Sequence, residues 1–175
     1  MSNLRFLREA SITSSSSALD VTDVFSTDFD IYKLKINKHQ SDSQQELALR
    51  YINSSGSVVT SSLYDVASEL QTSYSNFVAK RETNHDSFDF FGFNNTNVHM
   101  GGTYYIYLPS KSDCYTFGYN EIQSFVNGSS GLSYKGINIL KENSTITGFR
   151  LFGDDGHNIS QLNVKVYGIR KDWWH

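Results

Sequence analysis

The chain has 175 residues, which is enough for a single domain with a core of its own. Its formal net charge is −3, from 15 basic and 18 acidic residues, and no cluster of Lys and Arg stands out, so the sequence argues against nucleic-acid binding. No apolar run approaches the roughly 20 residues that a membrane span needs, so we expect no membrane insertion. Aromatic residues are abundant at 14%, and nearly all are Phe or Tyr, a composition typical of β-strands.

Residues 1–18 differ in character from the rest of the chain. The opening "MSNLRFLREA" is not followed by the apolar stretch of a signal peptide, so we expect a protein made in the cytoplasm. Leu4, Phe6 and Leu7 give this opening an amphipathic character, and a Ser-rich tract at 11–20 follows it. Two interpretations stay open: a flexible, frayed terminus, or a segment that anchors the protein to a partner.

From residue 19 onward the patterns are mostly those of strands. In "DIYKLKIN", the apolar residues Tyr32, Leu34 and Ile36 alternate with polar ones, which predicts a strand with one buried face. The segment "YDVASELQTSYSNFVAK" at 64–80 is different, because some of its apolar residues are spaced four apart. That spacing predicts a short helix there, with a long loop as the alternative.

Further along, the stretch "TYYIYLP" at 103–109 predicts a strand, and "DCYTFGYNEI" at 113–122 follows after a short polar turn, so the two should form a β-hairpin. The last third contains "LSYKGINILK", "STITGFRLFG" and "ISQLNVKVYGIR", short strand patterns separated by turn residues. We therefore predict an all-β fold, an antiparallel β-sandwich of jelly-roll type with about seven to nine strands. It would occupy residues 19–170, with a Trp-rich tail at 171–175.

No pattern in the sequence indicates catalysis or metal binding. The stretch "GDDGHN" at 153–158 lacks the ligand spacing of a Ca²⁺ loop, and Asp-Gly is typical of a hairpin turn. Asp86 and Asp89 are expected to face solvent while the Phe residues beside them point inward. The five histidines lack zinc-ligand spacing, and Cys114 is expected to be buried in a strand without activation. We therefore expect no catalytic residue, no metal and no cofactor, and predict that the protein is not an enzyme.

Tyrosines on the predicted hairpin suggest a binding surface instead. Tyr104 and Tyr105 are adjacent, so on a strand they must point to opposite faces, and Tyr107 shares the face of Tyr105. Exposed tyrosines suit sugar rings and protein partners, although they could equally fill a subunit interface. At the chain end, Trp173 and Trp174 are expected to pack on a neighbouring molecule or on the sheet.

Two stretches carry a resemblance to a known family. "LRFLREASITSSSSALDVTDVFSTDFDIYKLKI" and "ITGFRLFGDDGHNISQLNVKVYGIRK" are similar to the opening and closing strands of small virion structural proteins of tailed phages, especially those infecting marine cyanobacteria. These are capsid decoration, appendage or tail-fibre-like proteins, in which an aliphatic-rich tract leads into a "vFSsdYdnYki" strand. The matching residues are Phe25, Ser26, Asp28, Phe29, Asp30, Tyr32, Gly148, Phe149, Asn158, Ile159, Tyr167 and Gly168. Phe29 stands where that family commonly has Tyr. The resemblance implies a β-sandwich and a virion location, leaves the middle of the chain unmatched and transfers no catalytic residue.

Together these observations predict a phage virion structural protein, a decoration or appendage subunit on the capsid or tail that contacts the host surface. Its expected partners are other virion proteins, further copies of the chain in a homo-oligomer, and host surface glycans. The predicted contact residues are Leu4, Phe6, Leu7, Tyr105, Tyr107, Trp173 and Trp174. A carbohydrate-binding adhesin or receptor-binding module is the alternative. An enzyme such as a polysaccharide depolymerase is a third hypothesis, for which the sequence shows no paired carboxylates.

Overall fold

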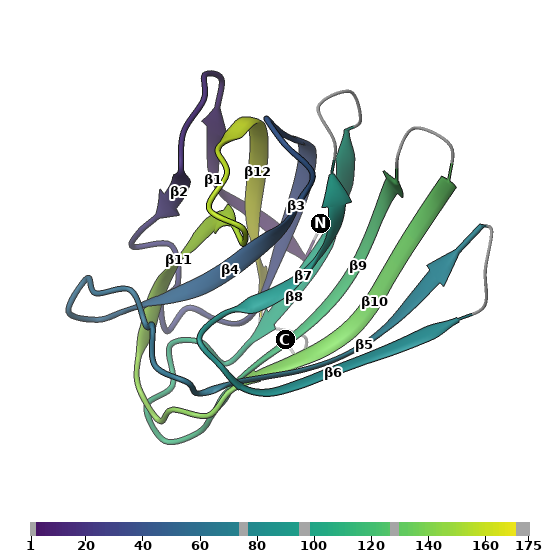
Figure 1. Cartoon of the computed structure of the whole chain (residues 1–175). Coiled ribbons are helices and arrows are strands. Elements are labelled where there is room, and N and C mark those ends of the chain that lie inside the picture. The colour runs from purple at the N-terminus through teal and green to yellow at the C-terminus, as the bar shows by residue number, and fades with distance from the viewer. Residues whose placement is uncertain (1–2, 74–76, 95–98, 127–129, 171–175) are drawn as a thin grey trace.

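The computed structural model describes residues 3–73, 77–94, 99–126 and 130–170, apart from the side chains of 90–94, 126 and 130. Within these residues the fold is all-β, with twelve strands in two sheets, every neighbouring pair antiparallel, and no helix (Figure 1). The predicted all-β class is therefore confirmed. The predicted number of strands was too low, because short strands and edge strands leave only a weak alternation in the sequence.

The large sheet has eight strands in the order β1-β12-β3-β8-β9-β10-β5-β6. Their bounds are Leu4–Ile12 for β1, Ile159–Arg170 for β12, Phe29–Ser41 for β3, Met100–Tyr107 for β8, Thr116–Val126 for β9, Ser130–Leu140 for β10, Tyr64–Thr72 for β5 and Val78–His85 for β6. The small sheet has four strands in the order β2-β11-β4-β7. Their bounds are Ala18–Val21 for β2, Ile146–Gly153 for β11, Gln45–Asn53 for β4 and Phe88–Asn94 for β7.

The two sheets share one buried core. On β3, Tyr32, Leu34 and Ile36 are all but inaccessible to solvent, as the alternation in the sequence predicts. The small sheet contributes apolar side chains such as Leu49 and Phe149 to the same core. The face of the large sheet that lines this core is called the inner face below, and the opposite face is called the outer face.

A chain of hydrogen bonds joins the two sheets inside this core. The hydroxyl groups of Tyr51 on β4 and Tyr104 on β8 lie 3.0 Å apart, and Tyr104 donates to the Oδ1 atom of Asn138 on β10 at 2.5 Å. Because the single hydroxyl hydrogen of Tyr104 is donated to Asn138, Tyr51 must be the donor in the bond between the two tyrosine hydroxyls. Gly118 makes room for this arrangement, since a Cβ atom there would lie 2.1 Å from the Tyr104 hydroxyl. Burial raises the pKa of both phenols, so both stay neutral.

The predicted helix at 64–80 is wrong. Tyr64–Thr72 is the strand β5 and Val78–His85 is the strand β6, which pair with each other in the large sheet. Val66 and Leu70 are four residues apart, a spacing that fits one face of a helix and equally one face of a strand. The strand prevails because β5 pairs along its whole length with β10, an interaction that local spacing does not reveal.

Residues 1–18 were interpreted either as a flexible terminus or as an anchoring segment, and the structure does not show a flexible terminus at Leu4–Ile12. Leu4–Ile12 is the strand β1, which pairs with β12 at one edge of the large sheet, and Ile12 is buried. Its pairing partner lies near the other end of the chain, so its sequence alone does not reveal the sheet that holds it. The proposed anchoring role of this segment remains a prediction.

Some of the residues that carry the resemblance meet in the core although they lie far apart in the sequence. The ring of Phe25 lies 4.6 Å from that of Tyr32 and 5.9 Å from that of Phe149, measured between centroids. The hydroxyl of Tyr32 donates to the carbonyl oxygen of Ser26 at 2.8 Å. The opening and closing motifs therefore form one structural unit of the core.

Two further expectations have a definite outcome. The predicted hairpin is present, because β8 and β9 pair in antiparallel register. Cys114, which was expected inside a strand, lies instead in the connection between them and is half-buried. The strand begins only at Thr116, since the residues before it form bends. The tail at 171–175, with Trp173 and Trp174, lies outside the described residues.

Candidate functional site

An aromatic and aliphatic surface crosses the outer face of the large sheet. The strand registers place Tyr105 opposite Tyr119, and Tyr119 opposite Ile137. The next row places Tyr107 opposite Phe117. Directly opposed residues of antiparallel strands share a face, so these side chains form one continuous layer. Its members are Leu4, Phe6, Ile31, Tyr105, Tyr107, Phe117, Tyr119, Ile137, Ile139, Tyr167 and Ile169, called the outer apolar face below.

The first strand extends this surface to the edge of the sheet. Phe6 pairs with Tyr167 on β12, with ring centroids 5.7 Å apart in an edge-to-face arrangement. Tyr167 in turn lies opposite Lys33, and Lys33 lies opposite Tyr105. The structure therefore joins two sets of predicted contact residues, from the chain start and from the hairpin, in one surface. Leu7 is not part of it, because its side chain packs against the core.

Several members of the outer apolar face are strongly exposed. Phe6 is 54% exposed, Ile137 is 57% exposed and Phe117 is 40% exposed. Isolated exposed apolar residues are ordinary on soluble proteins, but a continuous patch is typical of an interaction surface. Every described strand belongs to one of the two sheets and the small sheet lies on the inner face, so no described strand packs over this surface.

Three tyrosines at the centre of this surface form a compact group. The ring centroids of Tyr105 and Tyr119 lie 6.5 Å apart at an interplanar angle of 35°, and the Lys33 ammonium lies 5.5 Å from the centroid of the Tyr105 ring. Burial, followed by the neighbouring phenols of Tyr105 and Tyr119, raises the pKa of Tyr107. The group thus combines flat ring faces with hydroxyl groups, which can stack on a partner and hydrogen-bond to it.

Next to the tyrosines the surface is hollowed, where small residues such as Ala67, Ala79 and Gly136 lie among longer ones. A hollow of about 470 Å³ lies beside the exposed side chain of Ile137. Its lining combines apolar residues and charges of both signs: Ala67, Ser68, Glu69, Ala79, Lys80, Arg81, Tyr119, Lys135, Gly136 and Ile137. A ridge beside a hollow gives this face a shape that a complementary partner can match.

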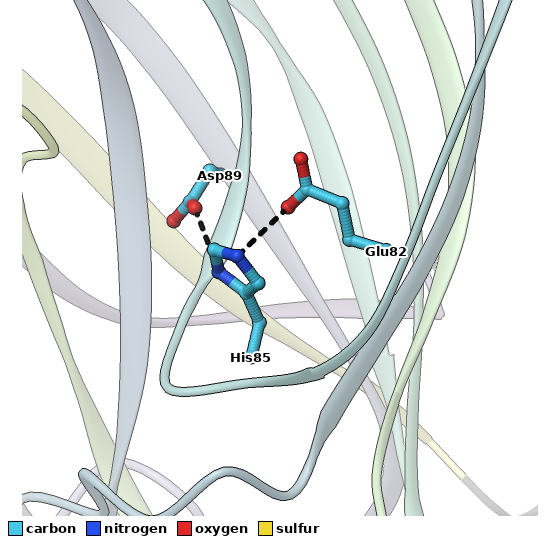
Figure 2. Close-up of side chains that lie close together, drawn as sticks. All are labelled: Glu82, His85 and Asp89. Carbon is cyan, nitrogen blue, oxygen red and sulfur yellow. Dashed lines mark ion pairs between the residues drawn. The ribbon is translucent and has the colours of Figure 1, made fainter.

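A second group of side chains, which the sequence analysis missed, lies where the chain passes from β6 to β7. Figure 2 shows the imidazole ring of His85 between the carboxylates of Glu82 and Asp89. The Nε2 atom of His85 lies 3.4 Å from the Glu82 carboxylate, and its Nδ1 atom lies 3.1 Å from the Asp89 carboxylate. Asp89 is only 4% exposed, which corrects the expectation that it faces solvent. The strand β7 places Asp89 beneath the β6–β7 turn, a position that depends on how the two sheets pack.

Other charges surround this group, called the Glu82–His85–Asp89 cluster below. The Lys80 ammonium lies 3.2 Å from Glu82 and 3.4 Å from Glu46 on β4. Burial is the largest cause of the raised pKa of Glu46, which the charge of Asp89 raises further and that of Lys80 lowers. Carboxylates from β4 and β6 therefore share the charge of Lys80.

No protein-family model, no curated protein and no solved structure matches this chain. Among the residues that the structure describes, none belongs to a helix long and apolar enough to cross a membrane.

Proposed function

We propose that the protein is a structural subunit of a phage virion, a decoration or appendage subunit on the capsid or tail, built as an antiparallel β-sandwich of jelly-roll type. The observation that carries the binding role is the outer apolar face, a continuous exposed surface that runs from β1 to β10. The virion location is supported by the resemblance of the first and last strands to small virion proteins. Such a face can hold a partner in an assembly without any catalytic group.

The partners we propose are other virion proteins and further copies of the same chain. A sheet with apolar side chains on both faces loses contact with water on only one of them when it folds alone. Covering the second face stabilises an assembly by roughly 25 cal/mol for each Å² of apolar surface removed from water. On a particle, many copies bind together, so modest affinity at each site still gives firm attachment.

The experiment is reattachment of the purified protein to particles that lack it. The wild-type protein is expected to bind such particles, and the variant Phe117→Ser together with Ile137→Ser is expected to lose at least tenfold in affinity. The matched control is Gln123→Ser, an exposed polar residue on the same face of β9, which should bind as the wild type does. Absence of binding by the correctly folded wild-type protein would falsify the virion role.

The oligomeric state gives a second test. If copies associate through the outer apolar face, light scattering should show an assembly for the wild-type protein and a smaller species for the double variant. Retention of the same assembly by the double variant would place the contact between copies elsewhere on the molecule.

A second candidate function is a carbohydrate-binding adhesin, favoured by the group formed by Tyr105, Tyr107 and Tyr119. Adjacent ring faces with hydroxyl groups suit the apolar face and the rim of a sugar ring. A glycan array should then show binding that Tyr105→Ala removes and Tyr105→Phe largely keeps, because stacking needs the ring and not its hydroxyl. An array without signal at millimolar sugar would reject this candidate and leave the assembly role standing.

A further inference from the structure

The Glu82–His85–Asp89 cluster lies at a special place in the fold. The strand β6 is an edge of the large sheet and β7 is an edge of the small sheet, so the turn between them carries the chain from one sheet to the other. Glu82 lies in the second half of β6, His85 is its last residue, and Asp89 lies at the start of β7. Anything that holds these three side chains together also holds the two sheets together at this end.

The spacing of the three side chains suits a metal ion. One ligand atom can be chosen from each residue so that all three atoms lie within 4.8 Å of one another. Around a tetrahedral zinc ion with bonds of about 2.0–2.1 Å, neighbouring ligand atoms lie about 3.3 Å apart. In the structure the Nε2 atom of His85 lies 3.4 Å from Glu82 and its Nδ1 atom lies 3.1 Å from Asp89, so both carboxylates lie beside the ring, and a rotation of the imidazole is needed to bring one nitrogen toward both. Imidazole nitrogen and carboxylate oxygen are both ligands that zinc uses in proteins.

Burial and charge also favour a cation here. Asp89 is almost completely buried, and its second carboxylate oxygen accepts a hydrogen bond from Ser87, which orients the group toward His85. Burial and the nearby charge of Asp89 are the largest causes of the raised pKa of Asp154, in the turn after β11. The Lys80 ammonium lies 3.4 Å from Glu46 and 3.2 Å from Glu82. Burial raises the pKa of Glu46, and the charges of Asp89 and Asp154 raise it further. A divalent ion would reduce the repulsion among these carboxylates.

We propose that Glu82, His85 and Asp89 bind one divalent transition-metal ion of the zinc class, which ties β6 to β7 and thereby the large sheet to the small one. Binding requires one ring nitrogen of His85 to face both carboxylates, so the imidazole ring must rotate. Glu82 must also leave its ion pair with Lys80 in order to bind the ion. His85 and Glu82 are partly exposed and can make these movements, while the buried Asp89 stays in place. With three protein ligands, water completes the coordination.

Metal binding needs ligand atoms that carry no proton, so the affinity for the ion is measured at pH 7.5. An ion that binds only the folded chain also raises its stability in proportion to the logarithm of the ion concentration above the dissociation constant.

The test uses the full chain, stripped with a chelator and then titrated with Zn²⁺, with Mg²⁺ as the comparison ion. Calorimetry should show one Zn²⁺ per chain at pH 7.5 and no binding of Mg²⁺, and the midpoint of thermal unfolding should rise by several degrees with Zn²⁺ alone. His85→Ala should lose at least a hundredfold in Zn²⁺ affinity. The matched control is His99→Ala, which removes an exposed histidine just before β8 and should bind Zn²⁺ as the wild type does.

The outcomes separate this proposal from the virion role. If Glu82→Gln and His85→Ala, both folded by circular dichroism, bind Zn²⁺ as tightly as the wild type, the site is elsewhere and the proposal fails. If the wild-type protein binds no Zn²⁺ at pH 7.5, the three residues form an ion-pair cluster only. Neither result bears on particle binding through the outer apolar face, because that face lies on the opposite side of the large sheet from the core.

Discussion

Tyr104 and Tyr105 are neighbours on β8, yet they lie on opposite faces of the large sheet. Tyr104 is fully buried, and its hydroxyl is held between Tyr51 and Asn138. Tyr105 is half-buried, and its ring contacts Lys33 and Tyr119 on the outer apolar face. The same side chain thus stabilises the fold in one position and offers a binding surface in the other.

The difference shows what each face requires. On the inner face, a polar atom shielded from water needs a partner within the protein. Gly118 has no side chain and so leaves room for the hydrogen bond between Tyr104 and Asn138. On the outer face, water or a partner molecule can satisfy a hydroxyl, so the aromatic residues can vary without damage to the fold. Mutations in the two faces should therefore separate stability from binding.

The largest effect is expected when the two neighbours are truncated. Tyr104→Ala should lower the free energy of unfolding by about 3–5 kcal/mol, because it leaves a cavity and breaks a buried hydrogen bond. Tyr105→Ala should lower it by less than about 1 kcal/mol. Urea denaturation of both variants measures the contrast. Equal losses would mean that the outer face is as much a part of the core as the inner one.

A buried histidine should make stability depend on pH. His39 on β3 is fully buried, and burial lowers its pKa from 6.5 to about 3. Between these values the unfolded chain binds a proton that the folded chain does not, so stability should fall with falling pH by up to about 1.4 kcal/mol per pH unit.

The raised pKa values of Glu46 and Asp154 act in the opposite direction, so the wild-type protein is compared with a His39 variant over the same range, pH 7.5 to 5.5. His39→Leu should flatten the profile in this range. The exposed His157, changed to Leu, is the control and should leave the slope as it is in the wild type. A slope that persists in His39→Leu would assign the effect to another group.

A smaller loss is expected at Gly168, a crowded glycine of the closing motif that packs against the opening one. A Cβ atom on Gly168 would lie 2.6 Å from the ring of Phe29, so Gly168→Ala should cost about 1–3 kcal/mol through overpacking. At Gly131 the added atom would meet Ser73 at 3.9 Å, an ordinary contact. Gly131→Ala should therefore leave the midpoint of thermal unfolding almost unchanged, and a similar loss in both variants would contradict the packing argument.

The smallest effect on stability is expected when only the hydroxyl group of each tyrosine is removed. Tyr104→Phe keeps the ring but removes the proton that Asn138 accepts, so it should cost about 1–2 kcal/mol. Tyr105→Phe should change stability by less than about 0.5 kcal/mol. Chemical denaturation with matched slopes resolves this difference. A neutral Tyr104→Phe would show that water replaces the lost donor inside the core.

Much of the fold could be predicted from alternation, and the failures share a cause. The alternation of Tyr32, Leu34 and Ile36 predicted β3 and its buried face correctly, because successive side chains on a strand point to opposite sides. The same reasoning failed for β5, where a four-residue spacing fits both a helix and a strand. Cys114 was misplaced because the strand β9 begins two residues after it, and strand boundaries depend on pairing.

The candidate site was predictable only in part. Tyr105 and Tyr107 could be assigned to one face from their parity, and Phe6 could be noted as an exposed aromatic residue. That Phe6 and Tyr105 share a surface depends on β12 and β3 lying between β1 and β8, a strand order that joins segments more than a hundred residues apart. The contact of His85 with Asp89 had a local signal, since the two are four residues apart, but no helix was expected there to bring them together.

The sequence by itself determined the strand character of the chain, the hairpin of β8 and β9 and the parity of its tyrosines, because these follow from the geometry of a single strand and its nearest neighbour. Only the tertiary structure decided which face is covered, where β1 pairs and why Asp89 is buried. Those features depend on strand order and on the packing of one sheet against another. They arise from long-range contacts, whose partners no local pattern in the chain identifies.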